Sequence, residues 1–275
     1  MSDIIILNSG DSAVLDPIQS GFAHGYGIFE TIKLSAGRLF LWQAHWQRLA
    51  DSAATLRLPL NHSAQQVLSA IRDLVQVDGL RDGVVKVSLM AAGDHAQCYV
   101  YSRSAVVPSE AGRLLFVADS PLNEHALLAG HKTHNYMENM LLLKSARSAG
   151  CSDVIRVNTA GQLAETAVGN LFFIQDEILF TPSLTAGGLP GVVRSVVLEA
   201  AQILGVPVVE GAFVPNVLQL IDAAFVTNSL VGIQAVDTVV VDAMERSVES
   251  AKHPMVVDLK EALGAVEAGS AIDIG

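Results

Sequence analysis

The amino-acid sequence predicts an α+β fold in two domains, and three observations support that prediction. The chain has 275 residues, which suits one large domain or two modest ones. In its first half, short apolar segments with strand-like alternation surround two segments of helical periodicity. In its second half, β-branched segments separated by glycine- and proline-rich turns outnumber the helical segments. We therefore expect a smaller N-terminal domain over residues 1–118, an interdomain linker over 119–130, which lacks periodicity, and a larger C-terminal domain over 131–275.

The N-terminal domain is expected to contain six strands and two helices. Residues 28–34 alternate as a strand does, and Ser35-Ala36-Gly37 is a hairpin signal. The first helix spans 42–58 and ends before Pro59, whereas the second begins after Ser63, a good N-cap residue, and runs to about Val77. Further strands are expected at 4–7, 38–41, 84–91, 97–103 and 113–117, and a glycine-rich loop at 21–27.

The C-terminal domain is expected to be richer in strands. One helix begins near Tyr136, a second spans 192–204 and stops at Gly205, and a third lies near 256–266. Residues 170–175 and 177–180 are expected to pair as a hairpin across Gln175-Asp176. The other expected elements are strands at 153–158, 206–210, 223–228 and 231–241, a turn at 159–162, a loop at 181–191 and a short helix at 217–221.

Composition excludes several classes of function. The formal net charge is -11 and the isoelectric point about 5.1, which argues against a nucleic-acid partner. The chain is 51% hydrophobic, yet its most apolar region, 189–209, is interrupted by Arg194 and Glu199, so we expect no membrane span. Cys98 and Cys151 are far apart and fit no metal spacing, so we expect buried thiols and a cytoplasmic protein. No metal is expected.

One lysine stands out by its neighbourhood. Lys132 lies between His131 and His134, immediately before the helix that is expected to begin near Tyr136. A lysine kept away from water loses basicity and becomes an amine nucleophile of the kind that forms Schiff bases. The alternative is an ordinary surface lysine in a loop.

Four further features, each taken alone, do not establish a ligand-binding site. Residues 189–194 place a glycine before a helix, and a helix N-terminus is a natural seat for phosphate. Thr227-Asn228-Ser229 ends a buried strand with polar side chains, and Arg48 lies on the first helix. Glu165 stands in a stretch of small residues, where a buried carboxylate requires a cationic partner. Together with Lys132, these features supply an amine, an acid and a phosphate-binding site, as pyridoxal phosphate requires.

The same residues carry a resemblance to a known family. The sequence resembles the fold-type IV pyridoxal-phosphate enzymes, or class IV aminotransferases, which include branched-chain and D-amino-acid aminotransferases and aminodeoxychorismate lyase. The resemblance implies a two-domain α+β fold with pyridoxal 5'-phosphate at the domain interface. The matching segments occur in family order and cover most of the chain: 25–31, 45–49, 132–139, 165–172, 191–194 and 227–230.

The resemblance also implies a role for each site residue. Lys132 would form the Schiff base with the cofactor and move the proton, and Glu165 would pair with the pyridinium nitrogen. Tyr136 would line the cofactor pocket. The phosphate would be held by Arg48, Val192, Val193, Asn228 and Ser229, the valines acting through backbone N–H groups. The family works as a homodimer, its substrate is a small molecule with an amine and a carboxylate, and the substrate neighbours would be His24, Tyr26, Glu30 and Thr31.

Two reactions remain open. The short chain, the Thr227–Ile233 stretch and the lack of an Arg-x-His motif in residues 84–104 favour a lyase that cleaves 4-amino-4-deoxychorismate to 4-aminobenzoate and pyruvate for folate synthesis. Glu30 favours an aminotransferase acting on branched-chain or D-amino acids, because several lyases carry threonine there. A non-catalytic binding protein is a third possibility, against which the presence of both Lys132 and Glu165 argues.

Overall fold

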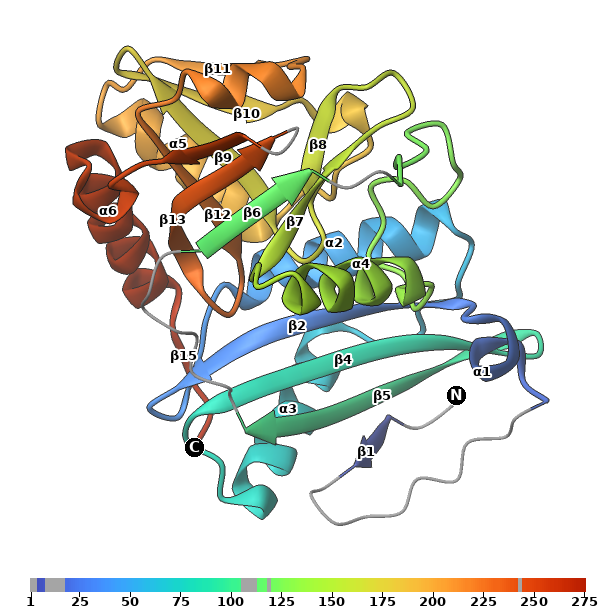
Figure 1. Cartoon of the computed structure of the whole chain (residues 1–275). Coiled ribbons are helices and arrows are strands. Elements are labelled where there is room, and N and C mark those ends of the chain that lie inside the picture. The colour runs from blue at the N-terminus through green and yellow to red at the C-terminus, as the bar shows by residue number, and fades with distance from the viewer. Residues whose placement is uncertain (1–3, 8–17, 105–112, 118–119, 242–243) are drawn as a thin grey trace. The chain divides into compact units, whose positions relative to one another are not determined.

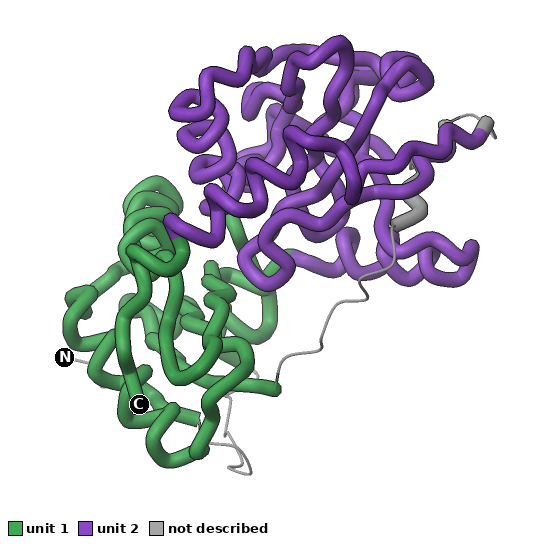
Figure 2. The backbone as a smooth tube through the Cα atoms, turned by 90° about the vertical axis from the view of Figure 1, so that its left-hand side faces the viewer, with its two compact units in different colours: residues 1–107, 131–135, 267–275 green, residues 108–130, 136–266 purple. Residues whose placement is uncertain are grey.

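A computed structural model describes residues 4–7, 18–104, 113–117, 120–241 and 244–275. The chain divides into two compact units, each with its own β-sheet, which confirms the predicted α+β class (Figure 2). Unit 1 comprises residues 1–107, 131–135 and 267–275, and unit 2 comprises 108–130 and 136–266. Residues 118 and 119, where the predicted N-terminal domain meets the linker, lie outside the described residues.

The sheet of unit 1 has six strands in the order β1-β5-β4-β2-β3-β15 (Figure 1). All neighbours are antiparallel except β1 and β5, which are parallel. The bounds are β1 Ile5–Leu7, β2 Gly27–Ser35, β3 Arg38–Leu39, β4 Gly83–Ala92, β5 His95–Ser104 and β15 Ile272–Asp273. The two-residue strand β15 lies in the small-residue C-terminal stretch, where periodicity gives no signal.

Three helices belong to unit 1: α1 (Ser20–His24), α2 (Trp42–Thr55) and α3 (Ala64–Asp78). The predicted cap of α3 is confirmed, because Ser63 Oγ accepts from Gln66 N and the Gln66 side chain accepts from Ser63 N, forming a capping box. Helix α2 ends three residues earlier than expected, since Arg57 adopts a left-handed conformation with φ 55°. Helix α1 replaces most of the loop expected at 21–27, and the apolar faces of α2 and α3 pack with β2, β4 and β5 into one core.

A short segment from the middle of the chain docks on β2. Phe29 N donates to Lys132 O and His134 N donates to Gly27 O, each at 2.9 Å, and Ile28 forms an isolated antiparallel bridge with Thr133. The partner strand β3 pairs with β2 only at Leu34 and Ser35 within the described residues. The first half of β2 therefore has an edge that this segment covers, and the backbone of Lys132 is fixed by sheet hydrogen bonds.

The sheet of unit 2 has nine strands, in the order β11-β10-β9-β12-β13-β6-β7-β8 with β14 paired to β13. The predicted hairpin of β9 and β10 is confirmed, with Asp176 and Glu177 both at positive φ in its turn. Strand β8, which carries Glu165, was not predicted. The bounds are β6 Arg113–Val117, β7 Asp153–Val157, β8 Leu163–Thr166, β9 Asn170–Gln175, β10 Ile178–Pro182, β11 Val208–Gly211, β12 Ala223–Asn228, β13 Gly232–Val241 and β14 Met244–Ser247.

The α-helices of unit 2 begin close to where they were expected. They are α4 (Met137–Ser148), α5 (Val192–Ile203) and α6 (Pro254–Ser270), whose last residues belong to unit 1, together with the short 3-10 helices η1 (Leu184–Ala186), η2 (Pro215–Gln219) and η3 (Ser250–Lys252). Gly205, at φ 70°, follows α5 as predicted, and Val206 N donates to Ala201 O at 2.8 Å, which closes the helix end.

Two exclusions from composition can be compared with the structure. Within the described part of the chain, no helix combines the length and apolar character that crossing a bilayer requires. Cys98 and Cys151 are free and buried, as expected. Burial raises the pKa of the Cys98 thiol to about 12, so this thiol is inert at neutral pH.

Candidate active site

Lys132 lies in the segment that covers the edge of β2, and its charge also acts on His45 of α2. Side chains alternate along β2, so Ile28 and Ile32 enter the core while Phe29 and Thr31 point to the other face. Thr133 is buried and pairs with Ile28, which turns its neighbour Lys132 toward the side of Phe29. The Lys132 ammonium lies 4.6 Å from the centroid of the Phe29 ring. The residue most strongly singled out by sequence is therefore held against an aromatic ring and is partly shielded from water.

A second lysine shares that ring. Lys86 on β4 lies directly opposite Thr31, and its ammonium is 4.5 Å from the Phe29 centroid. Burial, with the nearby charge of Arg103, lowers the pKa of Lys86. Two amines therefore lie against one ring.

His134 completes this face. Its ring lies 5.2 Å from the Phe29 ring, and its Nε2 is buried without a hydrogen bond among the described residues. Burial, followed by the charge of Lys86, lowers the pKa of His134 to about 4, so the imidazole is neutral at pH 7. A neutral buried ring with an unpartnered nitrogen can accept or donate one hydrogen bond to a ligand.

Glu30 points to the opposite face, into a closed group of charges. Its carboxylate accepts from Arg48 Nε at 2.8 Å and from Arg48 Nη2 at 2.6 Å, and lies 2.6 Å from His45 Nδ1. Glu30 is 2% exposed and His45 is 1% exposed. Burial alone would raise the pKa of Glu30, but the Arg48 charge and the bonds from His45 and Arg48 outweigh it and lower the pKa to about 2. Glu30 thus fixes the guanidinium of Arg48 in a bidentate pair.

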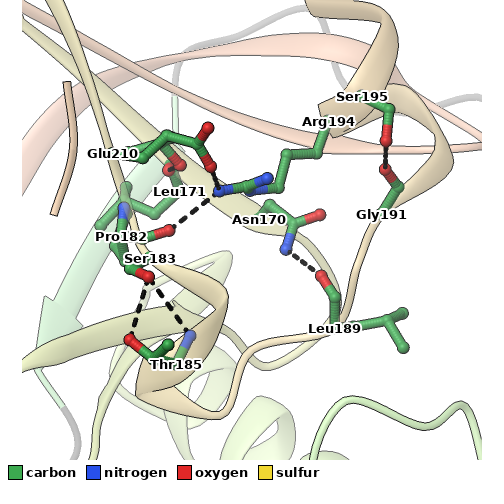
Figure 3. A network of polar contacts seen from close by, with 11 residues as sticks. Asn170, Leu171, Pro182, Ser183, Thr185, Leu189, Gly191, Arg194, Ser195 and Glu210 are labelled. Carbon is green, nitrogen blue, oxygen red and sulfur yellow. Dashed lines mark hydrogen bonds and ion pairs between the residues drawn. The ribbon is translucent and has the colours of Figure 1, made fainter. Parts of the chain in front are cut away.

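In unit 2, Glu165 is tied to the loop before α5. Its Oε2 accepts from Leu189 N at 2.8 Å. Asn170 Nδ2 donates to Leu189 O at 2.8 Å (Figure 3). The peptide groups on both sides of Leu189 are therefore held. An added Cβ at Gly188 would contact the Glu165 carboxylate at 3.7 Å. One loop therefore connects the candidate acid to the start of α5.

The start of α5 has the features of an anion seat. Its N-cap is Gly191, which provides no side-chain cap, and Val192 and Val193 form the first turn. Arg194 turns away and donates to Pro182 O at 3.1 Å and to Glu210 at 2.5 Å (Figure 3). Thr227 Oγ1 is buried without a hydrogen bond among the described residues, and Thr227 pairs with Asn170 across the strands. The first-turn N–H groups and this hydroxyl belong to the same side of the unit 2 sheet, because cross-strand partners share a face.

Gly191→Ala tests whether the start of α5 binds an anion. A Cβ at Gly191 would overlap Asn170 Oδ1, so we expect the Asn170–Leu189 bond to break and the first turn of α5 to shift. The expected result is about tenfold weaker binding of a phosphate-bearing ligand and a loss of about 1–3 kcal/mol of folding free energy. Calorimetry and chemical denaturation would measure both.

Gly264→Ala in α6 is the matched control, because no atom lies within 4 Å of its added Cβ. It should bind normally and gain about 0.5–1 kcal/mol, as alanine usually does in a helix. Equal binding of the phosphate-bearing ligand by both variants would contradict an anion-binding site at the start of α5.

The remaining predicted residues are placed as follows. Tyr136 is partly exposed at the N-cap of α4. Asn228 Oδ1 accepts from Leu230 N and Val231 N, so its side chain closes the turn after β12, and Ser229 is partly exposed in that turn. His24 is exposed in the last turn of α1, and the hydroxyl of Tyr26, an exposed residue, donates to Leu56 O at 3.2 Å.

Sequence reasoning did not single out Lys86 or commit to Thr227. The alternation of residues 84–91 places Lys86 opposite the apolar face that contains Val85 and Val87, and this pattern could have identified it. Thr227 could not be separated from its neighbours, because only the packing shows that its hydroxyl lacks a partner.

The residues present fit pyridoxal phosphate. A carboxylate, an uncapped helix start that excludes a Cβ, and an unpartnered hydroxyl meet the needs of a pyridinium and a phosphate in unit 2. A partly shielded lysine in unit 1 meets the need for an amine. No group of three or more metal-binding side chains occurs among the residues that the structure describes.

Comparison with known proteins adds an independent finding. The model of the amino-transferase class IV family matches residues 27–239. Over 238 residues, the chain is 28% identical to the aminodeoxychorismate lyase of Bacillus subtilis, covering 80% of each protein. It is 27% identical over 238 residues to the branched-chain-amino-acid aminotransferase of Escherichia coli, covering 78% of this chain and 77% of that one.

The fold is similar to a solved structure of the same aminotransferase class. The branched-chain amino acid aminotransferase from Escherichia coli superposes with a TM-score of 0.85 at 23% identity, covering 96% of this chain and 94% of that chain.

Proposed function

Because the chain belongs to the amino-transferase class IV family, we propose that it is a pyridoxal-phosphate-dependent lyase that converts 4-amino-4-deoxychorismate to 4-aminobenzoate and pyruvate. The observation that carries this choice is the second lysine, Lys86, beside Lys132 on the ring of Phe29. Relatives of both kinds, lyase and aminotransferase, match the chain over similar lengths, so similarity alone does not decide between them.

The proposal assigns a task to each unit. Lys132 of unit 1 would join the cofactor aldehyde. Glu165 of unit 2 would accept the ring N–H, and the N–H groups of Val192 and Val193 would hold the phosphate with Thr227 or Ser229. When bound, pyridoxal phosphate would supply an electron sink for the carbon that carries the substrate amine. Arg48, oriented by Glu30, is proposed as the cationic partner of the phosphate.

Lys132 would then transfer the proton, and Glu165 would stabilise the charge on the ring nitrogen. Lys132, once released by the substrate amine, would take the proton from the adjacent carbon. Glu165 would keep the ring nitrogen protonated. Cleavage would release pyruvate and leave an aromatic ring.

Recognition of the substrate supports the lyase. Aminodeoxychorismate carries two carboxylates, whereas a branched-chain amino acid carries one. Lys86 and neutral His134 offer a cation and a hydrogen-bonding nitrogen next to Phe29, and the charge of Arg103 lies near enough to Lys86 to lower its pKa. Glu30, the residue that favoured an aminotransferase, is enclosed by Arg48 and His45.

Lys86→Met tests this recognition. Loss of one charge-assisted bond of about 1.5–3 kcal/mol should raise KM for aminodeoxychorismate roughly 10- to 100-fold, with a smaller change in kcat. Release of 4-aminobenzoate, followed by fluorescence, measures both constants. Lys33→Met is the matched control. Lys33 lies on the neighbouring strand β2, on the same face of the sheet as Lys86, and it already pairs with Glu267 at 2.9 Å. A KM unchanged in Lys86→Met would remove the assigned contact.

The aminotransferase is the second candidate, since an aminotransferase relative covers as much of the chain as a lyase relative does. Incubation of the cofactor-loaded protein with L- and D-amino acids, without a keto acid, separates the two. Bleaching of the visible band by an amino donor supports the aminotransferase, and 4-aminobenzoate with pyruvate from aminodeoxychorismate supports the lyase. The homodimer and the cytoplasmic location stay predictions.

A further inference from the structure

Arg156 on β7 is a buried charge that the proposed reaction does not use. It is 2% exposed, and its Nη2 lies 2.8 Å from Glu138 Oε2 on α4. Nε and Nη2 nevertheless make no well-aligned hydrogen bond among the described residues. Burying a guanidinium with incomplete pairing is costly, and such groups are retained where they serve another purpose.

The register of the sheet shows which residue lies opposite Arg156. Strands β7 and β8 are antiparallel, and Arg156 lies directly opposite Glu165. Side chains at directly opposite positions share a face, with Cβ atoms about 4.5–5.5 Å apart. The side chain of Arg156 therefore leaves the sheet beside that of Glu165, the carboxylate that the cofactor nitrogen is proposed to use.

The charges near Glu165 can be followed on the described elements of unit 2 that pack around β8. Strands β9 and β10 and helix η1, which pack against β8, carry no titratable residue. Asp153 Oδ1 accepts from Val154 N and Ala167 N. Glu124, near Gly187, accepts from the backbone and side chain of Thr159, and Glu138 pairs with Arg156. These three groups are carboxylates and would discourage ionisation of Glu165, so Arg156 is the buried cation on these elements that opposes them.

We propose that Arg156 is a positioning residue for the cofactor, whose fixed charge keeps Glu165 ionised so that it can accept the ring N–H. The proposal rests on the cofactor assignment above. An opposite charge within about 4–6 Å lowers a carboxylate pKa by about 1–3. Without Arg156, Glu165 should become protonated in mildly acidic solution, and its hold on the ring nitrogen should weaken there.

The test measures ligand binding and does not depend on turnover. Pyridoxine 5'-phosphate, which has the ring nitrogen and phosphate but no aldehyde, is titrated calorimetrically into the cofactor-free protein at pH 6 and pH 8.5. Arg156→Met should bind about tenfold more weakly than wild type at pH 6 and within about threefold at pH 8.5, since the ionised fraction of a carboxylate falls about tenfold for each pH unit below its pKa and approaches one above it. Arg156→Lys, which keeps the charge, should follow the wild-type profile.

Two further variants separate this role from a structural one. In the Glu165→Gln background, Arg156→Met should have no additional pH-dependent effect. Arg246→Met is the matched control, because Arg246 is a partly buried arginine of unit 2 that donates to Ile221 O, and its profile should match wild type. If Arg156→Met does not fold, Arg156→Gln provides the uncharged variant.

The outcomes are distinct. A pH-independent loss in Arg156→Met, an equal loss in the Glu165→Gln background, or a Lys variant as weak as the Met variant would overturn the proposal while leaving the cofactor assignment intact. A wild-type protein that binds neither pyridoxine 5'-phosphate nor pyridoxal phosphate would overturn both.

Discussion

Lys132→Ala should abolish both turnover and the visible absorption band that pyridoxal phosphate gives when joined to a lysine. The Lys132 backbone is fixed on β2 by the hydrogen bond from Phe29 N, and its ammonium lies against the Phe29 ring. Removing the amine deletes both the covalent anchor and the proposed base, and losses of about 10⁴-fold or more are expected when the nucleophile of a coupled site is removed. Absorption spectra and 4-aminobenzoate release measure the two effects.

Two controls sharpen this result. Lys144→Ala removes an exposed lysine of α4 and should leave the spectrum and turnover unchanged. Lys86→Met removes the other lysine next to Phe29 and should keep the band while raising KM. A Lys132→Ala protein that retained the band would transfer the covalent role to another amine, and Lys86 would be the first to examine.

The secondary structure was largely predictable because most elements carry strong local patterns. Ser63 with Gln66 forms a capping box, and the polar pair Asp176-Glu177 forms the turn between two apolar strands, so α3 and the β9–β10 hairpin could be read from neighbours in sequence. Strand β8 was missed because it is only four residues long, and strand β15 because it has two residues and is stabilised by pairing with β3, which is far away in the sequence. Local periodicity contains no information on such pairing.

The candidate site likewise contains residues that the sequence could identify and contacts that it could not. Lys132 and Glu165 were identified because a lysine before a helix and a carboxylate among small residues are locally unusual. The enclosure of Glu30 by Arg48 and His45 depends on packing between β2 and α2. The pairing of Arg156 with Glu165 depends on register, which a one-residue slip would change. Residue types can be read from a sequence, whereas the partners that set their charge cannot.

Glu30→Gln should cause the largest loss of stability among these variants. Glu30 is buried, and neutralising it leaves the guanidinium of Arg48 without its carboxylate. Breaking a buried ion pair by removing one partner costs about 3–5 kcal/mol. Chemical denaturation at pH 7 should show this loss, whereas Glu199→Gln, at an exposed carboxylate of α5, should change the free energy of unfolding by less than about 0.5 kcal/mol.

The pH dependence gives this prediction a second, independent measurement. The folded-state pKa of Glu30 is lowered from 4.5 to about 2, so its contribution is fully present above pH 4.5 and is lost as the pH falls through 2. That shift corresponds to about 3 kcal/mol, in agreement with the cost of breaking the pair. The stability difference between wild type and Glu30→Gln should therefore be largest at neutral pH and narrow between pH 4.5 and 2. A difference that stayed constant over this range would show that the ionisation of Glu30 does not cause the loss of stability.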